Sequence, residues 1–311
     1  MPSPISRRWK LILQLVVAAV VCVFVARHLA ENWASYRTIS VSLRLRPAWL
    51  ALSLASLVVV SALQIESWRI ILRGWAQRLP FLAGARIWFL ANLGRYVPGK
   101  VWSVAGMVVL AEQEGVARWA SAAAAVAVQA IGIGTAAVLV TAATPHAYSP
   151  LRVAAALVLG LGTVALLAWK GALPRLGRVL GAAGEWRALP PGSVVAGSAF
   201  TLLSWCVYGF AFWALGRGLG LPPVLPLPDA AGVFALGYIL GLLALFAPGG
   251  IGIREMTFQT LLTPYLGVGG AAALTVASRL ELTFTEAAAG LGALALGGRR
   301  GKGREPLDAR T

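Results

Sequence analysis

The sequence predicts an all-α, polytopic integral membrane protein with about six transmembrane helices and two broken, re-entrant helical hairpins. Hydrophobic residues make up 59% of the 311 residues and charged residues only 12%, and the mean hydropathy is +0.77. Several runs reach the roughly 20 apolar residues that a helix needs to cross a bilayer. Two further apolar stretches are each interrupted by proline and glycine, and these interruptions predict the hairpins.

Six continuous apolar runs predict the full transmembrane helices. They cover residues 11–29, 49–66, 120–142, 151–169, 193–215 and 271–296. The first run follows Arg7, Arg8 and Lys10, as the apolar region of a signal peptide would. It is longer than such a region, however, and it lacks a small-residue cleavage site before Arg27. We therefore expect it to remain in the protein as a helix.

The two interrupted segments cover residues 84–112 and 230–265. The first contains Pro98 and Gly99, and the second contains Pro248, Gly249 and Gly250. Proline removes a backbone donor and clashes with the preceding helical turn, and glycine allows the chain to change direction. Irregular backbone at membrane depth is tolerated only where protein or a water-filled cavity satisfies it. We expect two hairpins that turn back at these breaks, beside a substrate site near the midplane.

The two halves of the chain follow one plan. When Pro98 is aligned with Pro248, the glycine–valine pairs at 115–116 and 267–268 also lie close in register, and two spans precede each hairpin. This pattern predicts a single transmembrane domain over residues 1–311, with half-repeats at 1–142 and 151–296 and a cytoplasmic tail at 297–311. Three crossings per half would invert the second half, so the hairpins should enter from opposite sides.

The distribution of positive charge predicts the orientation. Of the 27 Lys and Arg residues, 17 fall in segments assigned to the cytoplasm, 6 outside and 4 within the membrane segments. The positive-inside rule then places both termini in the cytoplasm of a multi-pass inner-membrane protein. The net charge of +16 suits anionic lipid head groups. Its dispersal over short loops argues against nucleic acid as a partner.

Three cations beside the breaks are candidate substrate-binding residues. Arg95 precedes the first break, Lys100 follows it, and Arg254 follows the second. A helix that restarts after a break points an N-terminus with partial positive charge into the membrane, which favours anions. We expect these residues to hold the phosphate of a lipid head group. The alternative is that they lie at the interface and snorkel to lipid phosphates.

Four more charged residues lie on the last predicted helices. At 100° per residue, Arg279 and Glu286 share a face, while Glu281 points nearly the opposite way. We expect Glu255, Arg279, Glu281 and Glu286 to line or gate a polar path, with Glu255 as a protonatable gate. The alternative is an ion-pair network that ties the last helix to the cations beside the breaks, with Glu255 stabilising a helix N-terminus.

Sequence motifs for metal, nucleotide or nucleophilic chemistry are absent. The chain has two His and two Cys residues, so it contains no zinc-binding His motif, and neither a nucleophile elbow nor a Walker loop occurs. We therefore expect no metal, no cofactor and no catalytic residue. A transporter is a better reading of this composition than an enzyme.

The quoted residues resemble a known family. The run from Arg95 to Trp102, with Gly115 beyond it, resembles the first signature of the lysylphosphatidylglycerol synthase transmembrane, or flippase-like, family. The run from Pro248 to Glu255 resembles the second, and the resemblance covers about residues 11–296. It implies movement of a lipid with a charged or glycosylated head group between leaflets. The best-known members also carry a soluble synthase domain, which this chain lacks, so aminoacyl transfer is not expected.

These observations predict a flippase for an anionic or glycosylated lipid, including an aminoacylated or sugar-linked lipid. One alternative is a membrane enzyme that acts on a lipid-linked sugar, with Glu255 or Glu281 as its carboxylate. Another is a non-catalytic partner subunit of a membrane glycosyltransferase. The expected partners are the lipid substrate, the bilayer, a glycosyltransferase or other lipid-modifying enzyme, and further copies of the chain in a homo-oligomer.

Overall fold

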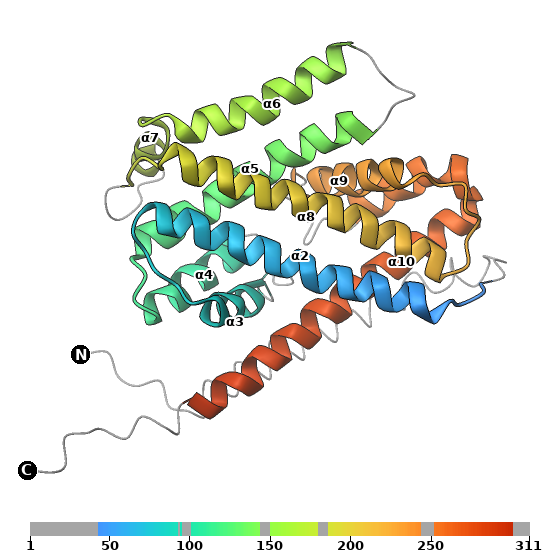
Figure 1. The fold of residues 1–311 in the computed structure, drawn as a ribbon, viewed down its shortest axis with the longest axis horizontal. Helices are drawn as coiled ribbons and strands as arrows, with labels where there is room; N and C mark the ends of the chain where they lie inside the picture. The colour runs from blue at the N-terminus through green and yellow to red at the C-terminus, as the bar shows by residue number, and fades with distance from the viewer. Residues whose placement is uncertain are drawn as a thin grey trace, which may run out of the picture.

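The structure is a computed structural model that describes residues 43–92, 94, 101–143, 150–179, 186–243 and 252–300. This part of the chain is helical and contains no strand, which confirms the predicted all-α fold (Figure 1). In chain order the helices are α2 (Pro47–Gly74), α3 (Phe81–Asn92), α4 (Val101–Gln113), α5 (Arg118–Ala143), α6 (Pro150–Ala168), α7 (Ala172–Val179), α8 (Pro191–Gly218), α9 (Leu227–Leu243) and α10 (Ile253–Arg300).

Four described helices, α2, α5, α8 and α10, are long and apolar enough to cross a membrane. A fifth span arises if α6 and α7, which meet at an 83° bend, count as one. Five of the predicted runs therefore fall on α2, α5, α6, α8 and α10, and the run at 11–29 lies outside the described residues. The chain is a multi-pass membrane protein, and the number of six crossings stays a prediction.

Helices α2 and α8 form an antiparallel pair at the centre of the molecule (Figure 1). At one end, the Arg46 N–H donates to the Gly218 carbonyl at 2.8 Å. Further along, the Ser67 hydroxyl donates to the Gly197 carbonyl at 2.9 Å. Lipid tails are as apolar as leucine, so packing of small residues and interhelical hydrogen bonds stabilise such pairs. The two hairpins pack against this pair, the first through α3 on α2 and the second through α9 on α8.

Helices α3 and α4 have the dimensions of a re-entrant hairpin. They contain 12 and 13 residues, or roughly 18 and 20 Å at 1.5 Å per residue, and a bilayer core is about 30 Å thick. The hairpin also begins and ends at the same end of the molecule, because the Ala117 N–H donates to Gln77 Oε1 at 2.9 Å. The geometry supports the hairpin predicted at 84–112. Pro98 and Gly99 lie outside the described residues.

Helix α10 folds back on itself at Gly267. This glycine has φ 67° and ψ 171° and interrupts the helical backbone. Arg279 Nη1 lies 3.4 Å from Glu255 Oε1, although 24 residues of straight helix would separate them by about 36 Å. The first part of α10 and its continuation after Gly267 are therefore two helices side by side.

Helix α9 and the first part of α10 form the second hairpin. The Tyr265 hydroxyl donates to Asp229 Oδ2 at 2.6 Å, so the start of α9 and the last turn before the fold-back lie together. The end at which this hairpin begins and ends lies opposite to the end at which α3 and α4 begin and end (Figure 1). The arrangement matches the hairpin predicted at 230–265. Its break residues, Pro248, Gly249 and Gly250, lie outside the described residues.

Matching helix ends support the predicted repeat. Helices α2 and α8 each have 28 residues and begin with proline, and each is followed by a residue of positive φ, Ala76 (58°) or Gly220 (72°). Gly115 (86°) and Gly267 (67°) end α4 and the first part of α10 in the same way. The antiparallel course of α2 and α8 is the one that an inverted repeat requires. The half-repeats at 1–142 and 151–296 stay a prediction.

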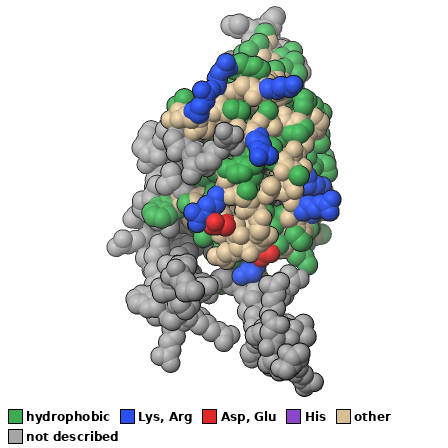
Figure 2. Space-filling view, turned by 90° about the vertical axis from the view of Figure 1, so that its left-hand side faces the viewer, with side chains coloured by type: hydrophobic (Ala, Val, Ile, Leu, Met, Phe, Trp, Pro, Cys, Tyr) green, Lys and Arg blue, Asp and Glu red, His purple; other side chains and the backbone are tan. Residues whose placement is uncertain are grey.

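Basic side chains gather at one end of the molecule. The loops after α2 and around α7, which are far apart in sequence, meet there, since Trp75 Nε1 donates to the Ala188 carbonyl at 3.0 Å. Figure 2 shows several Lys and Arg side chains spread over this end among hydrophobic ones, with few acidic side chains. The described basic residues of these predicted cytoplasmic segments are Arg69, Arg73, Arg78, Arg86, Arg118, Lys170, Arg175, Arg178 and Arg187.

Candidate functional site

The candidate site begins where α10 starts. Gly252 has φ 84°, a conformation that favours glycine. Its N–H donates to Glu255 Oε2 at 2.7 Å, and its carbonyl accepts from the Met256 N–H at 2.9 Å. These contacts form the reciprocal half of a capping box, in which a glutamate satisfies the N–H of the capping residue. The first turn of α10 is therefore fixed in place.

Arg254 lies in this first turn between two aromatic rings. Its guanidinium carbon is 4.8 Å from the centroid of Phe234 on α9 and 5.0 Å from that of Phe258 on α10. Cation–π attraction of this kind holds the side chain in position. Nη2 is buried and has no hydrogen-bond partner among the residues that the structure describes. A buried donor without a partner is costly, so this atom can receive an acceptor from a ligand.

An ion pair joins the two parts of α10 beside Arg254. The 3.4 Å contact of Arg279 with Glu255 brings together side chains that are only 16% and 23% exposed. Glu255 therefore has two partners, the Gly252 N–H and Arg279. The pair ties the last helix to the second break through Glu255, whereas the alternative expected from the sequence was a network through Arg254 or Lys100.

Tyr208 and Glu286 complete the surroundings of Arg254. Both lie near its guanidinium, as do Arg279 and Glu255. The Tyr208 ring also stacks on Phe234, with centroids 4.8 Å apart and an interplanar angle of 23°. The structure thus brings four predicted residues into one cluster, which we call the arginine cluster: Arg254, Glu255, Arg279 and Glu286.

The remaining predicted site residues lie elsewhere. Glu281 is half-buried, and its carboxylate interacts with the Ser53 hydroxyl on α2, on a different face of α10 from the arginine cluster. Arg95 and Lys100 lie outside the described residues, so their role at the first break stays a prediction.

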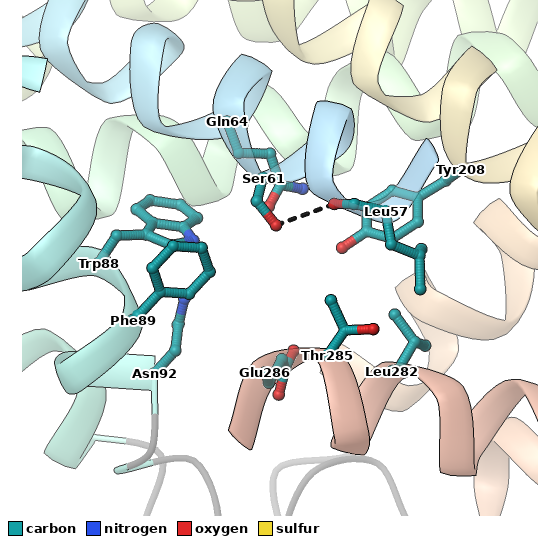
Figure 3. A pocket seen from close by; sticks show the side chains of 10 residues that line it. All are labelled: Leu57, Ser61, Gln64, Trp88, Phe89, Asn92, Tyr208, Leu282, Thr285 and Glu286. Atoms are coloured by element: carbon teal, nitrogen blue, oxygen red, sulfur yellow. Dashed lines mark hydrogen bonds between the residues drawn. The ribbon is translucent and has the colours of Figure 1, made fainter. Parts of the chain in front are cut away.

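A pocket lies next to the arginine cluster, between α2, α3, α8 and the last part of α10. Figure 3 shows its side chains arranged around an open centre, with aromatic rings from α3 on one side and polar groups from α2, α8 and α10 on the others. The lining residues are Leu57, Ser61, Gln64, Trp88, Phe89, Asn92, Tyr208, Leu282, Thr285 and Glu286.

Sequence reasoning missed most of these side chains. Phe234 and Phe258 read as ordinary apolar residues of membrane helices, and Gln64 and Tyr208 as isolated polar residues in long spans. A glutamine within an apolar run was the available signal, because polar residues within the membrane are costly. Their meeting depends on how α3 and α10 pack against α2 and α8.

The acidic groups of this region are partly engaged by protein partners. Asp229 accepts the Tyr265 hydroxyl, and Glu255 Oε2 accepts the Gly252 N–H. Glu255 Oε1 lies 3.4 Å from Arg279, but it is buried and accepts no hydrogen bond from the described residues. In the described part of the chain, no three His, Cys, Asp or Glu residues lie close enough together to hold a metal ion.

The fold and the cluster define a multi-pass membrane protein with buried cations beside a helix break. The chain belongs to the family described as the lysylphosphatidylglycerol synthase transmembrane region, whose model matches residues 11–282. This match confirms the resemblance that the paired signatures carry. Neither a curated protein nor a solved structure matches the chain.

Proposed function

We propose that the protein is a lipid translocase that moves an anionic or glycosylated lipid across the inner membrane. The observation that carries the proposal is Arg254, a cation held between Phe234 and Phe258 whose buried Nη2 has no hydrogen-bond partner among the described residues. In this proposal Arg254 binds the phosphate of the head group, and Arg95 and Lys100 at the first break contribute to the same task. Family membership supports lipid handling as the general role.

The chemistry of the guanidinium suits this ligand. Arginine presents a planar fork of donors that matches phosphate oxygens, and a charge-assisted hydrogen bond is roughly twice as strong as a neutral one. The site lies beside the N-terminus of α10, whose partial positive charge favours anions. The low dielectric of the surroundings strengthens each of these attractions.

The basic end of the molecule supports the orientation in this proposal. With both termini in the cytoplasm, the Lys and Arg residues of Figure 2 would face the cytoplasmic leaflet. Anionic lipids give that leaflet a negative surface potential, and each nearby cation contributes about 1 kcal/mol of attraction. Anionic substrate would therefore be concentrated at the end where the first hairpin enters.

The engagement of Glu255 favours a translocase over a membrane enzyme. A catalytic carboxylate must reach the reacting atom. Glu255 Oε2 accepts from the Gly252 N–H, and Oε1, which accepts no hydrogen bond from the described residues, lies 3.4 Å from Arg279. Glu281 lies beside Ser53, away from Arg254. A translocase needs no catalytic group. It needs side chains that bind the lipid head group while the lipid crosses between leaflets, and in this proposal Arg254 is one of them.

Leaflet-resolved lipid analysis of a deletion strain tests the proposal. Leaflet-selective chemical labelling followed by mass spectrometry should show one anionic or glycosylated lipid displaced to one leaflet. The wild-type protein and the Arg217→Gln variant should restore its distribution, because Arg217 lies over Trp213 at the opposite end of α8 from the basic end. The Arg254→Gln variant should not restore it. An unchanged distribution would contradict the proposal, and a lipid of altered mass would favour an enzyme.

A further inference from the structure

We propose that Glu281 is a proton-binding site: its carboxyl group carries a proton in this structure, and this proton holds the last part of α10 against α2 and α8. At 100° per residue, Glu281 points away from Arg279 and Glu286, so the site is separate from the arginine cluster. Three observations carry the proposal: the hydrogen bonds of Ser53, the lack of a cation beside Glu281 among the described residues, and the place of Glu281 within an apolar helix.

The hydrogen bonds of Ser53 determine which group supplies the proton. Ser53 is fully buried on α2, and its hydroxyl donates to the Ala211 carbonyl on α8 at 2.8 Å. A serine hydroxyl has one hydrogen and two lone pairs, so this bond uses its hydrogen. Towards Glu281, its other hydrogen-bond partner, Ser53 therefore offers a lone pair. The bond between them needs a hydrogen from Glu281, and a carboxyl group has one only when it is protonated.

The described part of the chain places no positive charge beside Glu281. Its one side-chain partner there is the Ser53 hydroxyl. The charged and titratable groups that the neighbouring helices carry on either side of Glu281 have other partners or lie exposed. They are Arg46, Glu66, Arg69, Arg73, Cys206, Tyr208, Arg217, Arg254, Glu255, Arg279 and Glu286. An ionised Glu281 would thus have no counter-charge among these groups.

The depth of Glu281 makes an ionised carboxylate costly. The residue lies within the apolar run at 271–296, roughly 21 Å along the helix from the fold-back at Gly267. The hydrocarbon core of a bilayer is about 30 Å thick, so the side chain lies within it. A charge at this depth is costly, whereas a protonated carboxyl is neutral and satisfies its hydrogen with Ser53.

The proton links three helices. Glu281 donates to Ser53, and Ser53 donates to the Ala211 carbonyl, so the bonds run from α10 through α2 to α8. When the carboxyl gives its proton to water, the first bond loses its hydrogen and a charge appears beside the lone pairs of Ser53. The last part of α10 then moves away from α2, and Arg279 and Glu286 move with it. A proton gradient is therefore a source of energy for movement of the arginine cluster.

Infrared spectroscopy of the full-length protein in liposomes tests the protonation. The difference between the wild-type protein and Glu281→Gln should contain a carboxylic acid band at about pH 6. This band should fall from about 90% to about 10% of its intensity over roughly two pH units, as a single titrating group requires. Glu112→Gln, which removes a carboxylate paired with Arg118 at 2.7 Å, should leave the band in place. Ser53→Ala should shift it, and Ser56→Ala, whose hydroxyl bonds within α2, should not.

Spin-label distances test whether the proton holds the helices together. The labels are attached through Val58→Cys on α2 and Phe284→Cys on α10, both exposed, in a variant without native cysteines. The distance should be longer at high pH than at low pH. With Glu281→Gln it should keep the low-pH value throughout, because the amide donates to Ser53 without titrating. With Ser53→Ala the longer distance should occur at low pH as well.

The results decide the proposal without any measurement of lipid movement. If the difference spectrum contains no acid band between about pH 5 and pH 9, and Ser53→Ala shifts none, Glu281 is ionised and the proposal is wrong. A band that does not titrate, or a distance that is independent of pH in the wild-type protein, shows that the proton does not control α10. Since neither measurement uses lipid transport, the proton site and the translocase can fail independently.

Discussion

Replacement of Arg254 tests whether this residue binds lipid or only stabilises the fold. Arg254→Gln removes the charge and shortens the side chain, and Arg254→Met removes the charge while it keeps an apolar stem. Either change removes the Nη2 donor, which has no partner in the described part of the chain, and the cation–π contacts with Phe234 and Phe258. The loss of cation–π attraction destabilises the fold by about 1–2 kcal/mol, and the removal of a buried donor without a partner stabilises it by a similar amount. We expect little change in thermal stability.

The effect on lipid binding should be much larger. A hydrogen bond to a charged group contributes about 1.5–3 kcal/mol, and about 1.4 kcal/mol corresponds to a tenfold change in affinity. Both variants should therefore need about ten- to hundredfold more anionic lipid for half-maximal transport. Arg254→Lys keeps the charge but not the planar fork, so its loss should be smaller.

The assay measures initial transport rates in proteoliposomes across a series of anionic lipid fractions, together with melting temperatures in detergent. Arg217→Gln is the control, because Arg217 also lies over an aromatic ring, Trp213, at 4.7 Å. If Arg254→Gln and Arg254→Met transport anionic lipid like the wild-type protein, Arg254 is not a binding residue. If both lose folding and Arg217→Gln does not, Arg254 is a structural anchor.

Three further predictions concern the frame of the site. Gly115→Ala and Gly267→Ala should each lower the free energy of unfolding by about 1–2 kcal/mol, measured by thermal unfolding, because both glycines have positive φ while no other atom lies near an added Cβ. A double-mutant cycle on Arg279→Gln and Glu255→Gln should give a coupling of about 1–3 kcal/mol. A cysteine at Arg178, in a variant without native cysteines, should react with membrane-impermeant reagents only from the cytoplasmic side.

Each of these predictions has a contrasting outcome. Gly162→Ala is the control for the glycines, since Gly162 also has open space around it but lies within α6; equal stability of all three variants would contradict the argument from φ. Additive effects at Arg279 and Glu255 would show that their ion pair contributes nothing. Labelling of the cysteine at position 178 from the outside would contradict the proposed orientation.

The sequence predicted the helices and the hairpins because both depend on local properties. Long apolar runs indicate spans wherever they occur. The predicted runs match α5, α6 and α8 within three residues, whereas α2 continues to Gly74, eight residues beyond its predicted end. The matched pairs at 115–116 and 267–268 identified two glycines that both adopt positive φ. The count of Lys and Arg residues assigned several loops to the same side of the membrane. The structure places these loops at one end of the molecule (Figure 2).

The site could be predicted only in part, because it depends on packing between distant segments. Hydropathy treated the last span as a separate helix, and the fold-back at Gly267 that joins Glu255 to Arg279 is a property of tertiary structure. The aromatic rings around Arg254 come from α9 and α10, and nothing in the sequence of either distinguishes Phe234 from a residue that faces lipid. The pocket needs four helices at once, so no local pattern indicates it.

The central claim is that the protein moves anionic lipid between leaflets, and a transport measurement on the purified protein tests it most directly. Tail-labelled fluorescent phosphatidylglycerol is placed in proteoliposomes, and reduction of the outer label reports the leaflet of each molecule over time. The account predicts exchange faster than in protein-free vesicles, slowed about tenfold or more by Arg254→Met at low lipid fraction. Exchange equal to that of protein-free vesicles would contradict it.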